Sequence, residues 1–326
     1  AFCTGSQDLG AAQQAFLTDV ASWAALQPLL VGPLAEGNRA WQVQFWPDKK
    51  NLVARQVEQL VKSDTPLTGE SLAKSSIVVQ GLSAYEYVLF DKTIDLGDSA
   101  TKARYCPLLT SIGEHHQQLA AGVLQQWEDK DGMADQLRSF PNERYAEPSE
   151  AIAELLRVQV TALDGLKKKL GAPLGRQTKG HPQPYQAEGW RSDTTLASIA
   201  AAVKGAESLW LGADNNGLRS LLPAEQADLA QRIDAAYAQL LQHLLGLHRL
   251  HGIARGQQLR HVAGHGGHRG QEQLARVQRG RGGSGLRGLG HGANGARNGR
   301  SWQSWNYRPR QRAHRGLFDK LSVLLV

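Results

Sequence analysis

Apolar residues recur at spacings of three and four along most of the chain, up to about residue 245. This is the period of an α-helix that buries one face. Four such stripes run over residues 109–127, 152–170, 196–210 and 229–244. The alternating pattern of a half-buried strand is absent from this stretch. The sequence therefore predicts an all-α fold of about eight helices, packed as two antiparallel helical bundles.

The ends of the helices and the boundary between the bundles follow from breaker residues. Ser192 is predicted to cap the helix that carries Leu196, and Pro223 to be the first residue of the last helix. Residues 171–189 are rich in Gly, Pro and Gln and form the best boundary. We therefore expect a first bundle half over residues 1–172 and a second, incomplete half over residues 173–250.

Beyond Gly246 the composition changes abruptly. Fourteen Arg and one Lys against Glu272 and Asp319 give residues 247–326 a charge of +13, so the total of +7 leaves −6 on residues 1–246. An acidic body is not expected to bind nucleic acid. Residues 251–326 are rich in Arg, Gly and His and are expected to be disordered. Translation out of frame explains this composition better than an arm that binds RNA or anionic lipid.

Residues 76–90 are apolar on nearly every side of a helical wheel, which predicts one central, buried helix. Gly81 within it is expected to let a neighbouring helix approach closely. Glu86 is the exception, with Ser83 on the same face, and Tyr85 and Tyr87 beside it as candidate hydroxyl donors. One interpretation is a Glu at a partly wet helix edge. The other, which we prefer, is a buried Glu86 with a hydrogen-bonding or cationic partner at a polar site.

The hexapeptide Gly81-Leu-Ser-Ala-Tyr-Glu86 resembles the Gly-x-His-x-x-Glu signature of imelysin-like proteins. Residues 40–47, 104–106, 190–192 and 212–218 resemble further segments of that family in the same order, so the resemblance covers roughly residues 1–245. It implies a pair of helical bundles in the periplasm or cell envelope of a Gram-negative bacterium. It also implies a role in iron uptake or regulation, or the activity of an insulin-cleaving metallopeptidase.

Ser83 stands where the family has His. A His and a Glu three residues apart can ligate a metal together, whereas a Ser hydroxyl is a poor ligand, so Zn or Fe at Glu86 would lack a ligand. We therefore expect a non-catalytic protein that binds an iron-related or peptide ligand through Gly81, Ser83, Tyr85 and Glu86. A metallopeptidase is the alternative. The adjacent His115 and His116, and His181 in a loop, are not expected to replace the missing ligand.

Export, which the resemblance implies, places the two cysteines in an oxidising compartment, so Cys3 and Cys106 are expected to form a disulfide. No run of eighteen apolar residues predicts a membrane span. An export signal is expected to have been removed ahead of Ala1. Membrane association would then depend on an anchor that preceded Ala1.

Overall fold

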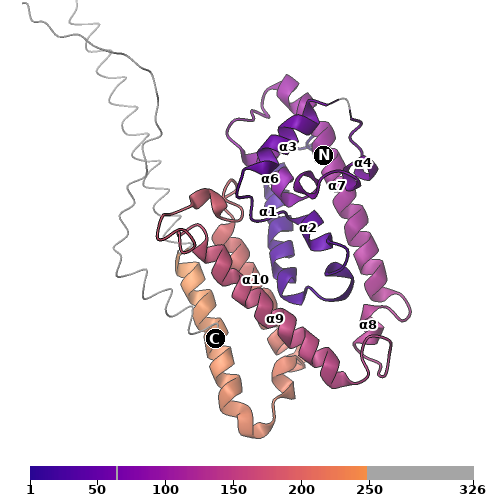
Figure 1. Ribbon diagram of the computed structural model, residues 1–326, viewed down its shortest axis with the longest axis vertical. Coiled ribbons are helices and arrows are strands. Elements are labelled where there is room, and N and C mark those ends of the chain that lie inside the picture. The colour runs from indigo at the N-terminus through magenta and orange to yellow at the C-terminus, as the bar shows by residue number, and fades with distance from the viewer. Residues whose placement is uncertain (64, 248–326) are drawn as a thin grey trace, which may run out of the picture. The chain divides into compact units, whose positions relative to one another are not determined.

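The computed structural model describes residues 1–63 and 65–247, and this part of the chain is helical without a strand (Figure 1). The predicted all-α fold is confirmed. The expected disorder of residues 251–326 lies outside the described residues, and the division at residue 172 stays a prediction. None of the described helices is long and apolar enough to cross a membrane.

The α-helices number more than the eight expected, because several have only one or two turns. Four short helices, α2, α4, α5 and α8, carry no periodic stripe long enough to be seen in the sequence. Residues 227–247 form a further helix at the end of the described chain. The bounds of the labelled helices are α1 Leu9–Leu26, α2 Arg39–Val43, α3 Leu52–Val61, α4 Gly69–Ala73, α5 Ile77–Gln80, α6 Leu82–Phe90, α7 Ser99–Glu128, α8 Met133–Gln136, α9 Pro148–Gly171 and α10 Thr195–Leu211.

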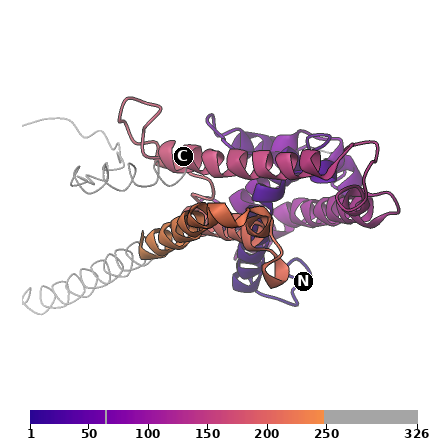
Figure 2. The same cartoon turned by 90° about the horizontal axis from the view of Figure 1, so that it is seen from below.

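The largest apolar core gathers side chains of α1, α3, α6 and α7. Its members include Val57, Val88 and Leu108, all without exposed surface. α10 packs against both α1 and α9 (Figures 1 and 2). Gln159 of α9 donates its Nε2 hydrogens to the Ala206 carbonyl at 2.7 Å and the Tyr237 hydroxyl at 3.1 Å. This buried amide joins α9, α10 and the helix over residues 227–247.

The predicted helix over residues 76–90 is broken at Gly81. Gly81 is extended, with φ −127° and ψ −163°, so α5 ends before it and α6 begins after it. A Cβ at Gly81 would lie 2.3 Å from the carbonyl oxygens of Gln42 and Val43. The close approach expected at Gly81 is therefore present, and the neighbour is the carboxyl end of α2.

Two predicted helix starts are wrong. Thr194, not Ser192, is the N-cap of α10. Pro223 is followed by a 3-10 turn, Ala224–Gln226, and the α-helix begins at residue 227. The Ser192 hydroxyl is instead used by Glu86.

Candidate functional site

Glu86 lies on the buried helix α6 with 7% of its surface exposed. Its Oε1 accepts a hydrogen bond from the backbone N–H of Ser192 at 2.8 Å and one from the Ser192 hydroxyl at 2.6 Å. Burial raises the pKa of Glu86, and the hydrogen bonds from Ser192 and the charge of Arg191 oppose that rise. The prediction that Glu86 is buried with a hydrogen-bonding partner is confirmed.

The turn over residues 188–195 brings Ser192 to this carboxylate. Gly189 has φ +68°, a left-handed conformation that glycine adopts without strain, and its carbonyl accepts from the Thr194 N–H at 3.0 Å. The Thr195 hydroxyl donates to the Glu188 carbonyl at 2.6 Å and closes the turn. The turn therefore supports Ser192 before α10 starts.

Arg191 forms an ion pair beside Glu86. Its Nε lies 2.8 Å from Asp91 Oδ2, and the side chains of Arg191 and Asp91 are 6% and 16% exposed. The guanidinium carbon stands 4.3 Å from the Trp190 ring centroid and 5.0 Å from that of Tyr87. Burial alone would raise the pKa of Asp91, but hydrogen bonds from Arg191 and Thr93 hold that pKa below its ordinary value.

The other predicted site residues face different partners. The Ser83 hydroxyl donates to the Phe45 carbonyl at 2.8 Å. The Tyr85 ring stacks on that of Phe16, with centroids 6.2 Å apart. The Tyr87 hydroxyl donates to Glu58 at 3.2 Å, and so is not the donor to Glu86 that the sequence suggested.

The residues around Glu86 do not fit a resident Zn or Fe ion. In the part of the chain that the structure describes, no group of three or more His, Cys, Asp or Glu side chains could hold a metal. The Glu86 Oε1 already accepts two hydrogen bonds from Ser192. The neighbouring guanidinium of Arg191 would also repel a cation.

His115 and His116 lie on α7, with ring centroids 6.1 Å apart. Their Nε2 atoms are buried without a hydrogen-bond partner among the described residues. Burial, and then the neighbouring His115, lower the pKa of His116 to about 4, and burial lowers that of His115. Burial therefore favours the neutral form of both rings, with His115 buried and His116 half-buried. His181 is an exposed loop residue, as expected.

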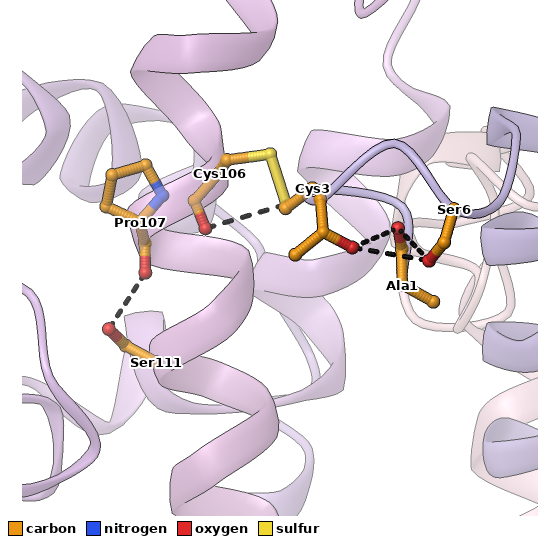
Figure 3. Close-up of a disulfide and its surroundings, with 7 residues drawn as sticks. Ala1, Cys3, Ser6, Cys106, Pro107 and Ser111 are labelled. Atoms are coloured by element: carbon orange, nitrogen blue, oxygen red, sulfur yellow. Dashed lines mark hydrogen bonds between the residues drawn. A yellow bond between two sulfur atoms is a disulfide. The ribbon is translucent and has the colours of Figure 1, made fainter.

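Cys3 and Cys106 form the predicted disulfide, with Cα atoms 5.6 Å apart (Figure 3). The bond ties the segment before α1 to the first turns of α7. It joins residues 103 positions apart in the sequence. Among the described residues, no cysteine is free.

A second polar cluster near the turn was not predicted. Lys169 Nζ of α9 lies 2.7 Å from Glu188 Oε2 and 2.6 Å from Gln27 Oε1. It also stands 5.7 Å from the Trp46 ring centroid. Trp46 and the residues beside Ser192 lie in two of the segments that resemble the family. Those segments were the sequence signal that could have pointed to the clusters around Glu86 and Lys169.

Comparison with known proteins decides the family. The family model described as Imelysin matches residues 1–306. The chain belongs to the imelysin family. The match extends past residue 245, where the sequence analysis placed the end of the resemblance.

The fold of this imelysin-family chain is also that of a solved relative. An imelysin-like protein from Psychrobacter arcticum 273-4 superposes with a TM-score of 0.61 at 19% identity, over 74% of this chain and 73% of the other. At that identity the likeness shows the fold alone. The search of curated proteins gives no match.

Proposed function

We propose that this protein is a non-catalytic imelysin of the cell envelope that binds a ligand at the polar site around Glu86, in iron uptake or its regulation. The observation that carries the proposal is the set of hydrogen-bond partners of Ser83 and Glu86, the two residues at the motif positions. Ser83, in place of the family's His, donates to the Phe45 carbonyl, and Glu86 accepts from Ser192. The pair does not converge on a point where a metal could polarise a peptide bond.

The geometry favours ligands that carry hydrogen-bond donors. A group that replaced Ser192 at Glu86 would have to supply N–H or O–H donors to a buried carboxylate. Peptide amines and amides supply such donors, and so do the hydroxyl groups of an iron complex. A bare cation supplies none and would meet Arg191. We therefore propose a peptide or a complexed form of iron as the ligand.

The disulfide supports a place in the periplasm, because such bonds persist in oxidising compartments. Family membership agrees with that compartment. Fractionation of the native cells tests the location. Recovery in the cytosolic fraction with two free thiols would contradict it.

Activity and metal content separate this proposal from the alternative, a metallopeptidase. The full-length protein is analysed for Zn and Fe and incubated with insulin, with and without a chelator. We expect less than stoichiometric metal and intact insulin. One equivalent of tightly held metal, lost in Glu86→Gln together with chelator-sensitive cleavage, would establish the peptidase instead.

Binding is tested by titrating the same protein with ferrioxamine B, an iron complex that carries amide N–H groups, and with insulin. Saturable binding to either probe should be lost in Glu86→Ala. It should be kept in Glu70→Ala, which alters an exposed carboxylate paired with Lys74. If neither probe binds the unaltered protein, the ligand-binding part of the proposal is wrong.

A further inference from the structure

A pocket of about 350 Å³ lies between α9, α10 and the 3-10 turn Gln27–Leu29. α9 provides most of its wall through residues 157, 158, 161, 162, 165, 166 and 169, which share one face of the helix. Pro28 and Leu30 close it on the side of the turn, and Ala202 closes it on the side of α10. The Glu86 carboxylate is not part of this lining.

The lining is mainly aliphatic, and its charge has one sign. Val158, Leu163 and Leu166 give it an apolar surface without an aromatic ring. Its charged members, among the described residues that line it, are Arg157 and Lys169, and both are cations. The pocket therefore suits an aliphatic molecule, and an anionic group on that molecule more than a cationic one.

The two cations differ in how much of each is exposed and in how firmly its partners hold it. Lys169 is 13% exposed, and its ammonium is held by Glu188 and Gln27. Arg157 is 68% exposed and lies 3.6 Å from Glu154, whose carboxylate is already bound by Arg144 and by the Tyr145 hydroxyl. Arg157 can therefore turn to an anion without leaving a buried carboxylate unpaired.

We propose that this pocket binds a single-chain anionic amphiphile such as a fatty acid, with its tail against the aliphatic wall and its headgroup at Arg157. The volume is at the low end of small-molecule sites, which fits one short acyl chain and not the two tails of a phospholipid. Lys169 lies at the other end of the α9 wall from Arg157, and its charge is balanced by Glu188. This inference does not depend on the role of Glu86.

Gly165 gives a direct way to fill the pocket. A Cβ at Gly165 meets no heavy atom within 4 Å, although the residue is in the pocket wall. Gly165→Phe therefore puts a ring into the cavity without disturbing the backbone. Gly113→Phe is the matched control, since Gly113 is an exposed glycine inside α7 that also has nothing within 4 Å of a Cβ.

The experiment is a calorimetric titration of the full-length protein and its variants with decanoate and with decan-1-ol. Decanoate should bind the unaltered protein with a stoichiometry of one. Gly165→Phe should weaken that binding by about tenfold or more, and Gly113→Phe should leave it unchanged. Arg157→Gln should weaken decanoate binding and leave decanol binding as it was. Circular dichroism checks that each variant folds.

Several results would overturn the proposal. The proposal fails if decanoate does not bind, if it binds without saturation, or if it binds equally to the protein with Gly165→Phe. A bilayer lipid is separated by cosedimentation with phosphatidylglycerol vesicles. If Gly165→Phe abolished binding to the vesicles, the occupant would be a membrane lipid, and the proposal of a free amphiphile would be wrong. If Arg157→Gln weakened decanoate and decanol binding equally, the assigned place of the headgroup at Arg157 would be wrong.

Discussion

The hydrogen bond from the Ser192 hydroxyl to Glu86 should be among the strongest polar contacts of the fold. It joins α6 to the turn before α10 at 2.6 Å, across 106 residues of sequence, and its acceptor is 7% exposed. A hydrogen bond to a charged group contributes about 1.5–3 kcal/mol. Since the Ser192 backbone N–H stays in place, Ser192→Ala should cost a value in the lower half of that range.

The assay is urea unfolding of the full-length protein at pH 7, followed by circular dichroism. Ser208→Ala is the control, because Ser208 is an exposed residue of α10 whose hydroxyl donates to the Lys204 carbonyl at 2.9 Å. We expect the control to change the free energy of unfolding by less than about 0.5 kcal/mol. If Ser192→Ala costs no more than Ser208→Ala, the carboxylate does not rely on Ser192, and the account of the site fails.

The contribution of Glu86 to the free energy of unfolding should fall as the pH rises. The pKa of Glu86 is raised in the folded protein, so folding favours its protonated form. The stability that Glu86 contributes is therefore full below its unfolded pKa and falls as the pH rises through the higher, folded value. Glu86→Gln keeps an oxygen that can accept both Ser192 hydrogen bonds. It should raise stability at pH 7 more than at pH 4, and a larger gain at pH 4 would reverse the argument.

Three further outcomes are expected. Replacing Cys3 and Cys106 by Ser should lower the free energy of unfolding by about 2–5 kcal/mol, and thiol titration of the unfolded, unreduced parent should find neither thiol. Gly81→Ala should lower the melting temperature because its Cβ would meet two carbonyl oxygens at 2.3 Å, whereas Gly113→Ala should raise it. The pKa of His116 is lowered to about 4, so the free energy of unfolding should fall as the pH falls from about 6.5 to about 4. His116→Gln should make the free energy of unfolding less dependent on pH over that range.

Periodicity predicted the long helices because each repeats its apolar face over several turns. The stripes at residues 109–127, 152–170 and 196–210 all lie inside α7, α9 and α10. α5, with four residues, is too short to show a period, and its end at Gly81 depends on carbonyl groups about 40 positions away. A local pattern cannot contain that contact, so the break in the predicted helix could not be read from residues 76–90.

The same distance in sequence explains what was missed around Glu86. Its burial could be predicted, because it interrupts an apolar helix. Its partner could not, since Ser192 lies in another segment and its sequence context suited a helix cap equally well. The roles of Arg191 and Asp91 likewise depend on a contact between residues 100 positions apart.

A buried carboxylate on an apolar helix is a local conflict that the fold must resolve elsewhere. The turn over residues 188–195 resolves it by giving Glu86 two donors from Ser192, and Arg191 adds a nearby positive charge that is itself balanced by Asp91. The same turn is tied to α9 through Glu188 and Lys169. Packing alone does not require the two ion pairs of this turn, because replacing such pairs by apolar side chains of similar volume often leaves a protein at least as stable. The polar groups of this turn therefore support the proposed binding site around Glu86, and the Ser192 and Glu86 variants above test how far they also serve stability.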